Sequence, residues 1–427
     1  MAVGAMSCGA ETAADRKPTS DGDTTPAEGN SARIMPTVSR RGDSVDILSF
    51  AADAFDRAPQ LSLDSAPLAA TAGIAGSRDF DLTYVNSVRL LSDNRMVAFA
   101  SIGARVLLFG ADGKEERTIG RQGKGPGEFM RPGGVLVLPG DTLFLTDFPN
   151  NRLNWVMPDG RFVRTSMMEW ERPARGAQRL AGMLVGGRVV LTSAGIVSWK
   201  ESDTVFRSLA SVVVQPFAGA GREIATVPDL AEVTVSVRLR GRDQRENMVL
   251  RFTPWAHVAV WDSLIVTSAS DTYQITMRTP TGTVLRELRT PLSKRPVTAT
   301  MTERALRAEL EHIESAVGEG GTDVLSKAER RNAARLTPIA DSVPVISGII
   351  VASNGTLWVL DMSAASGDEG TFATAYAPDG AMIGRLAIPS DASPVAFGAD
   401  RVVLRTRDAD DVVSLRVHRI VSTKRAP

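Results

Sequence analysis

Short runs of apolar residues separated by polar turns recur along most of the chain. In the stretch VRLLSDNRMVAFASIGARVLLFGADGKEERTIG (88–120), four such runs are divided by a turn at Asp93-Asn94, a short break and a turn at Asp112-Gly113. Apolar residues alternate with others inside the runs, which is typical of half-buried strands. Asn and Gly at the turns supply the positive φ angles that tight hairpins need. The stretch therefore predicts a four-stranded antiparallel meander.

The same pattern occurs five more times. The further copies, with their paired turns where these are clear, are 133–165 (Gly140-Asp141, Asp159-Gly160), 258–291 (Trp261-Asp262, Thr281-Gly282), 348–389 (Asn354-Gly355, Asp379-Gly380) and the weaker segments 179–217 and 393–421. An isolated sheet of this kind exposes two apolar faces and two edges, and a radial arrangement buries each face against its neighbour.

Six units predict an all-β fold, a six-bladed β-propeller of four-stranded antiparallel blades, over residues 39–427. A set of stacked sandwiches is the alternative. VDILSF (45–50) is expected to pair with the final blade and close the ring. Residues 1–38 are too poor in apolar side chains to pack and predict a disordered N-terminal tether.

The glycine-rich stretch IGRQGKGPGEFMRPGGV (119–135) is the most distinctive motif. A Walker-type phosphate loop would need Ser or Thr after Lys124 and a helix thereafter, but Gly125 and a strand-like GVLVL follow. The glycine spacing also misses the dinucleotide fingerprint. Pro126-Gly127 fits the central positions of a type II turn. The stretch is therefore interpreted as a joint between two blades, with Phe129 wedged between them.

This joint resembles the blade junction of NHL-repeat propellers, with GPGEF (125–129), a strand that ends at Asp147, and an Asn151-Arg152 pair. Together with DTYQI (271–275), a helical insertion and GTLWV (355–359), the order of features is similar to a group of bacterial six-bladed propeller lipoproteins related to NHL proteins. The resemblance covers about residues 40–421. It implies the architecture and says almost nothing about chemistry.

Residues 300–336 break the strand pattern and predict a helical hairpin inserted between blades four and five. Thr300 and Glu303 form a capping-box pattern, and Ser326 and Glu329 repeat it for a second helix, which is expected to run to about Leu336. An apolar stripe of the first helix comprises Leu306, Leu310, Ile313 and Val317. Three roles stay open: a lid over the central pocket, a partner-docking element, or a brace.

Charge and cysteine content limit the partners. Lysine and arginine equal aspartate and glutamate at 49 each, which gives no reason to expect a nucleic-acid partner. No apolar run is long enough to span a bilayer as a helix. The one cysteine, Cys8, rules out an intramolecular disulfide.

Cys8 lies in AMSCGAE (5–11), which resembles the lipobox of bacterial lipoproteins, although Ala5 replaces the usual Leu and no basic or apolar leader precedes it. If the true start lies upstream of Met1, an extracytoplasmic lipoprotein in the periplasm or outer membrane, tethered by a lipid on Cys8, is expected. Otherwise Cys8 is an ordinary residue of a cytoplasmic protein.

Catalytic groupings are not evident, and neither a cofactor nor a metal is expected. The three histidines, His257, His312 and His418, fall in different elements, so a shared zinc site like that of the amidating lyases is not expected. A lactonase-like calcium site would draw on oxygens such as those of Asn86, Asp147, Asn150 and Asn151, which are more simply turn residues. Nucleophile-elbow, H-E-x-x-H and C-x-x-C motifs do not occur.

Arg238 and Arg240 lie in VTVSVRLRGRDQREN (233–247), where alternation predicts that both project from one strand face. Paired guanidinium groups suit an anion, although charge that protects an exposed edge explains them too. The candidate binding residues are Arg238, Arg240, Arg121, Lys124, Asn151 and Arg152.

The leading hypothesis is a monomeric, non-catalytic binding or scaffold propeller, outside the cytoplasm, that recognises a protein, peptide or glycan partner. The alternative is a calcium-dependent lactonase-like hydrolase with its metal in the central channel. Both rest largely on analogy of fold, which does not fix function.

Overall fold

The structure is a computed structural model. It describes residues 33–42, 44–72, 82, 85–100, 104–130, 132–168, 178–193, 203–315, 325–362, 371–408 and 412–422. The predicted tether lies mostly outside these ranges. Pairing begins at Ile34, which forms an antiparallel bridge with Met382.

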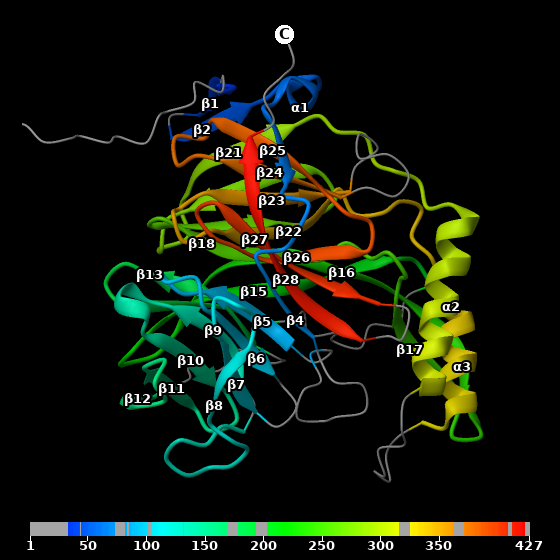
Figure 1. Ribbon diagram of the computed structural model, residues 1–427. Coiled ribbons are helices and arrows are strands. Elements are labelled where there is room, and N and C mark those ends of the chain that lie inside the picture. Colours follow the sequence, from blue (N-terminus) through cyan, green and yellow to red (C-terminus); the bar gives the residue numbers. More distant parts are fainter. Residues whose placement is uncertain are drawn as a thin grey trace, which may run out of the picture. The chain divides into compact units, whose positions relative to one another are not determined.

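Within the described ranges the strands of residues 33–427 form a six-bladed propeller, as predicted (Figure 1). Blades one and two consist of β5 (Val85–Leu90), β6 (Met96–Ala100), β7 (Arg105–Phe109), β8 (Glu115–Ile119), β9 (Pro132–Val137), β10 (Leu143–Asp147), β11 (Arg152–Val156) and β12 (Phe162–Met167). Blades three and four consist of β13 (Gln178–Leu184), β14 (Arg188–Ser193), β15 (Phe206–Pro216), β16 (Arg222–Leu239), β18 (His257–Trp261), β19 (Leu264–Ser268), β20 (Tyr273–Arg278) and β21 (Val284–Thr290).

Blade five contains β22 (Ile346–Val351), β23 (Leu357–Asp361), β24 (Thr371–Tyr376) and β25 (Met382–Ile388), and blade six contains β26 (Ala392–Phe397), β27 (Arg401–Arg407) and β28 (Val413–Ser422). The innermost strands contact one another in the cyclic order β5, β9, β13, β18, β22, β26 and back to β5. This cycle closes the ring.

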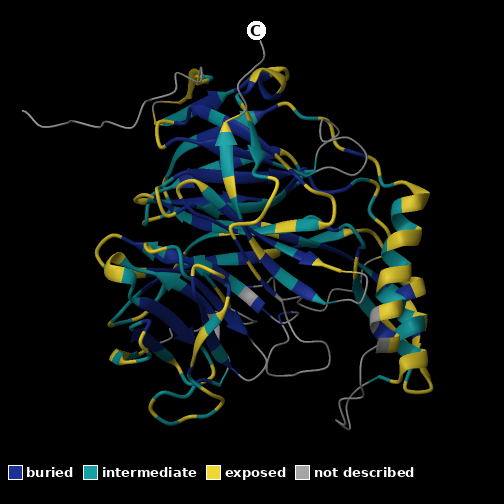
Figure 2. Ribbon diagram, in the orientation of Figure 1, coloured by how far each residue is buried: buried dark blue, intermediate teal, exposed yellow. Residues whose placement is uncertain are grey.

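The blade interfaces carry the core. Among the described residues, the buried apolar side chains form six clusters, and each cluster joins two neighbouring blades. Strand β6 shows the reason, because Met96 and Ala98 belong to the interface with blade six whereas Val97 and Phe99 belong to the interface with blade two. Period-two alternation sends successive side chains to opposite faces. All five residues of β6 are buried. Much of the ribbon of the blades is coloured as buried in Figure 2.

The N-terminal segment closes the ring differently from the prediction. β2 (Val45–Ser49) pairs in parallel with β21 of blade four, with β1 (Thr37–Arg41) outside it. The fourth strand of blade six is β4 (Ala69–Ala72), which pairs with β28, and β3 (Gln60–Leu63) pairs with both β25 and β28. The short helix α1 (Ala54–Arg57) lies between β2 and β3. The expected pairing of 45–50 with the final blade is therefore wrong, because Ala69–Ala72 already occupies that edge.

The predicted hairpin turns are confirmed at their glycine and asparagine positions. Gly113 has φ 84°, and its amide donates to the carbonyl of Gly110. The strand register shifts between Leu108 and Phe109, next to this turn. Such a turn followed by a left-handed residue and a bulge is a common connection that glycine favours. The corresponding turn of blade two, between β11 and β12, has Gly160 at φ 87°. The 3-10 turn η2 (Pro139–Asp141) joins β9 and β10, as the Asp93-Asn94 turn joins β5 and β6.

Helices α2 (Ala299–Ser315) and α3 (Lys327–Leu336) lie between β21 and β22, side by side (Figure 1). The capping box of Ser326 and Glu329 is present as predicted. The capping pattern predicted from Thr300 is wrong, because α2 begins at Ala299 and the hydroxyl of Thr298 accepts from the amide of Met301 at 3.3 Å. Val317 lies outside the described residues.

Candidate functional site

The glycine-rich joint between blades one and two folds as the sequence predicts. The amide of Glu128 donates to the carbonyl of Gly125 at 3.2 Å, and Gly127 has φ 77°, which is a type II turn over Pro126-Gly127. Phe129 is fully buried, with its ring 5.9 Å from that of Phe162. A side chain at Gly120 would overlap the ring of Phe129, so only glycine permits this approach.

The polar residues of the joint bond mainly within it. Arg121 pairs with Glu128 at 2.9 Å, and the amide of Gly125 donates to the same carboxylate at 2.8 Å. The Gly125 amide, together with the Arg121 guanidinium, holds the pKa of Glu128 below its usual range. Arg152 donates to the carbonyl of Gly125 at 3.2 Å, and Lys124 is exposed.

Asp147 and Asn150, two of the residues considered for calcium, hold the same joint. Asp147 is fully buried, and its Oδ2 accepts from the amide of Met130 at 3.0 Å and from Asn150 Nδ2 at 2.7 Å. Asn151 is an exposed turn residue with φ 51°. Within the described residues no group of three or more histidine, cysteine, aspartate or glutamate side chains is arranged to hold a metal ion. The side chain of Asn86 lies outside the description.

Arg238 and Arg240 do not lie on one strand face, which corrects the sequence interpretation. β16 ends at Leu239, and Arg240-Gly241 is the two-residue turn to β17 (Arg242–Val249), with φ values of 52° and 73°. Two positive φ values in succession are typical of a type I′ hairpin. Arg238 is exposed and lies 3.8 Å from Asp243.

The β16–β17 hairpin extends blade three at the end of the ring where the inner strands begin. Glu232 and Thr234 are buried, whereas Ser236 and Arg238 on the same alternation are exposed. The strand therefore passes from the packed blade into a projecting ribbon. β16 is 18 residues long, and apolar and polar residues alternate into its last part. This unusually long alternation is the sequence signal that could have predicted the projecting hairpin.

A polar cluster that the sequence interpretation missed lies between blades three and four. Glu232 is fully buried, and neither carboxylate oxygen has a described partner in hydrogen-bonding geometry. Burial raises the pKa of this carboxyl, the nearby Ser208 hydroxyl lowers it, and the charge of Asp229 raises it. Asp229 accepts from the amide of Ala256 at 2.9 Å.

The charge of the same aspartate also acts on His257, the first residue of β18. Its Nε2 is buried without a hydrogen-bond partner, and its ring lies 5.6 Å from that of Trp255. Burial lowers the pKa of His257 to about 4, against smaller opposing effects of the Ile346 backbone and Asp229. Glu232 and His257 are thus both shifted toward their neutral forms, which suits hydrogen bonding to neutral groups rather than capture of ions.

Arg207 joins blades three and four beside this cluster. Its guanidinium pairs with Asp271 at 2.5 Å and donates to the carbonyls of Asp229, Pro228 and Ala269. His418 lies apart, in β28 of blade six, with Nδ1 3.2 Å from the carbonyl oxygen of Asp64. The side chain of His312 is outside the description. The described histidines therefore do not converge.

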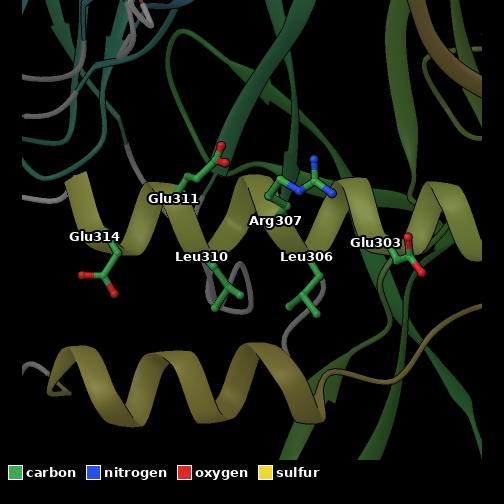
Figure 3. Close-up of a pocket in the computed structure, with 6 residues that line it drawn as sticks. All are labelled: Glu303, Leu306, Arg307, Leu310, Glu311 and Glu314. Atoms are coloured by element: carbon green, nitrogen blue, oxygen red, sulfur yellow. The ribbon is translucent and has the colours of Figure 1, made fainter.

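The helical insertion carries a groove of about 830 Å³ along α2. It is lined by Glu303, Leu306, Arg307, Leu310, Glu311 and Glu314. Leu306 and Leu310 point from α2 to the side on which α3 lies, and both are half-buried (Figure 3). They are two of the four residues of the apolar stripe predicted from the sequence, and a third, Ile313, is buried.

Arg251 fixes the insertion to blade three. Its guanidinium donates to Glu309 of α2 at 2.5 Å and to the carbonyl of Ala334 in α3 at 2.9 Å, and its side chain is 10% exposed. The backbone of Arg251 also pairs with Pro338 and Ala340. One arginine therefore ties both helices to the segment that follows the β16–β17 hairpin.

Comparisons with known proteins agree with the ring. Residues 76–174, which contain blades one and two, match the family model DUF5128, described as a 6-bladed beta-propeller. No curated protein matches the chain. Among the described residues, none of the helices is both long and apolar enough to cross a membrane.

Several solved structures are similar at low identity. A Bacteroides fragilis protein provisionally described as exported is 12% identical, with a TM-score of 0.44 over 88% of this chain and 100% of that one. A DUF4221 family member from Bacteroides vulgatus is 8% identical, with a TM-score of 0.46 over 86% and 99%. Virginiamycin B lyase from Staphylococcus aureus is 10% identical, with a TM-score of 0.38 over 79% and 80%.

Proposed function

We propose that the protein is a non-catalytic binding propeller that holds a protein, peptide or glycan partner through its helical insertion. The observation that carries this proposal is the α2 groove, in which Leu306 and Leu310 are only half-buried although Arg251 anchors both helices to the ring. An apolar stripe with a charged rim, presented on a fixed support, is typical of a docking surface. Ile313 of the same stripe is buried, so the groove exposes only the Leu306 and Leu310 part of the stripe.

The neutral polar cluster of Glu232 and His257 fits the same proposal. Both pKa shifts remove charge from the end of the ring that carries the insertion. A lid and a calcium-dependent hydrolase remain alternative hypotheses.

For location, we propose attachment outside the cytoplasm through a lipid on Cys8. The support is the AMSCGAE sequence and the polar segment after it. Residues 1–32, which include Cys8, lie outside the described part of the chain. Mass spectrometry of the protein purified from its source would detect an acylated cysteine, and an unmodified Cys8 in that material would contradict the proposal.

The binding function is tested by capture from an extract of the source organism, with a glycan array in parallel. The immobilised proteins are the wild type, the double variant Leu306→Glu/Leu310→Glu, and the matched control Val185→Glu, which changes an exposed residue in the β13–β14 turn at the other end of blade three. We expect one ligand to be retained by the wild type and the control and lost with the double variant.

Two outcomes contradict this proposal. Equal retention by all three proteins would place the binding surface elsewhere, and no retention above the blank matrix would remove the binding role. Thermal unfolding of each variant shows whether the ring is intact, because the insertion can be disturbed without loss of the blade interfaces.

A further inference from the structure

Strand β17 forms the outer edge of blade three. It is the last strand of the described sheet β13-β14-β15-β16-β17, and residues 242–245 are all exposed. An exposed edge strand can pair with another strand unless a proline, a bulge or repelling charge prevents it. β17 contains no proline, pairs with β16 without a bulge, and carries charges of both signs. This edge is therefore suited to a strand with complementary charges.

The hairpin turn determines which backbone groups of β17 point to the edge. Leu239 and Arg242 flank the two-residue turn, so they form a hydrogen-bonded pair. Because the two kinds of pair alternate along an antiparallel ladder, Asp243 and Arg245 direct their amides and carbonyls away from β16. A second copy of β17 can pair about a two-fold axis only if opposite residues both direct these groups to the partner or both direct them away. Opposite residue numbers must then differ by an even number.

One such register pairs every charge of β17 with an opposite charge. With Gln244 on the axis, Arg242 lies opposite Glu246 of the second copy, and Asp243 lies opposite Arg245. Centring the ladder on any of the four charged residues instead places that residue opposite itself. Opposite charges across a ladder stabilise it, and like charges destabilise it. The charges of β17 therefore favour the register centred on Gln244.

The other outer edges of the described blades lack this self-complementarity. β4 has no charged residue, β12 has Arg164 alone, and the charged residues of β1 are both arginines. In β8, the register that pairs Glu115 with Arg117 places Glu116 opposite itself. Charge on an outer strand thus does not by itself produce a matching register, and the match at β17 favours a second copy of the chain as its occupant.

The recorded ion pairs of β17 are compatible with this pairing. Asp243 lies 3.8 Å from Arg238, and Arg245 pairs with Asp203, in both cases between exposed side chains. A guanidinium has five N–H donors, so Arg245 can bond a second carboxylate beside the first. Arg242 and Glu246 lie on the opposite face of the strand, and these pairs do not involve them.

We propose that two copies of the chain dimerise through the β17 edge, in the register centred on Gln244, and join their blade-three sheets into one continuous sheet. The ladder comprises residues 242–246 of each copy. Because so short a ladder buries little surface, the dimer should dissociate on dilution. This inference does not rest on the proposed binding function, and it departs from the monomer expected from the sequence.

Analytical ultracentrifugation of the full chain over a concentration series measures dimerisation. We expect a reversible wild-type dimer that weakens as salt is added. Arg242→Glu places two acidic side chains opposite each other at both ends of the ladder and should weaken dimerisation about tenfold. Arg242→Glu/Glu246→Arg restores opposite charges and should recover the dimer. Arg117→Glu, the same charge change at an exposed residue of β8, is the control.

A cysteine on the two-fold axis tests the register. Cys8→Ser removes the one cysteine of the chain and provides the background. Gln244→Cys then lies opposite itself in a non-hydrogen-bonded pair, whose Cα atoms are about 4.5 Å apart and within disulfide range. Oxidation should give a covalent dimer. Asn247→Cys, which also keeps all four charges but lies away from the axis, should remain uncrosslinked.

Several results would overturn this inference. They are a monomeric wild type at every concentration, a dimer that Arg242→Glu weakens no more than Arg117→Glu does, or a dimer that the double charge variant fails to restore. A disulfide that forms as readily at Asn247→Cys as at Gln244→Cys would contradict the register. Thermal unfolding shows whether each variant is folded, and if Arg242→Glu is not, the cysteine variants decide.

Discussion

The interface between blades one and two differs in kind from the interface between blades three and four. In the first, buried apolar residues come from both blades, among them Phe99 and Leu108 from blade one and Phe129 and Leu143 from blade two. In the second, the buried apolar residues come from blade three, with Ile265 as the contribution of blade four.

Partly buried apolar residues of blade four, among them Val258 and Val260, also pack in this interface, and buried polar groups lie beside them. Glu232 and His257 are shifted toward neutral forms there, and Arg207 bridges the two blades. The hairpin and the helical insertion project from this side of the ring. The comparison teaches that the strongest motif marks a joint whose described polar residues bond mainly to one another, while the polar interface next to the projections carries no recognisable motif.

The largest expected effect breaks the apolar interface. Phe129→Ala removes a fully buried ring between blades one and two and should lower the free energy of unfolding by about 3–5 kcal/mol. Denaturant unfolding measures the change. Met167→Ala, at a residue that is 58% exposed, is the control and should have little effect. A loss no greater than that of the control would show that Phe129 is not a wedge between blades.

The next effect is a pH dependence that arises in the polar interface. The pKa of His257 is about 4 in the folded protein, against about 6.5 in an unfolded chain, so the unfolded chain binds more protons between these values. Stability should therefore be complete above pH ~6.5 and fall by up to ~3 kcal/mol as the pH drops to 4.

Unfolding free energies measured across this range for the wild type and His257→Gln test that account. The variant lacks the titrating ring, so its stability should fall less steeply between the two pKa values. If the unfolding free energies of the two proteins fall equally steeply with decreasing pH, His257 is not buried in its neutral form.

A smaller effect of opposite sign is expected at Glu232. Its folded pKa is raised, so its contribution to stability is complete below the ordinary carboxyl value and is lost as the pH rises through the folded value. Glu232→Gln keeps the shape without the charge and should stabilise the protein by about 1 kcal/mol at pH 8, with less gain at pH 4. Thermal unfolding of the wild type and the variant at pH 4 and at pH 8 measures this difference in stability. A variant that is less stable than the wild type at pH 8 would indicate a cationic partner for the carboxylate.

The smallest expected effect concerns the hydrolase alternative. Calcium that binds the native state raises the melting temperature by mass action, and a protein without a calcium site shows no change. We expect the same melting temperature in calcium and in a chelator. A rise with calcium that Asp147→Asn abolishes would favour the hydrolase, and Asp159→Asn, an exposed turn residue of the same blade, is the control.

The sequence by itself determined the ring and its joints. Apolar alternation and turn residues are local signals, so six meanders, the type II turn at Pro126-Gly127 and the capping box at Ser326 could be predicted from neighbouring residues alone. The wedge at Phe129 followed from the same motif.

Only the tertiary structure decided which distant segments meet. β4 rather than β2 completes blade six because edge pairing depends on how the ring closes, and short strands of similar composition compete for that edge. Likewise the amide of Arg240 meets Glu329, and the charge of Asp229 acts on His257, because folding brings residues of different elements together. The charge and burial of such residues depend on all the groups that surround them in the folded protein. The order of residues along the chain does not show which groups these are.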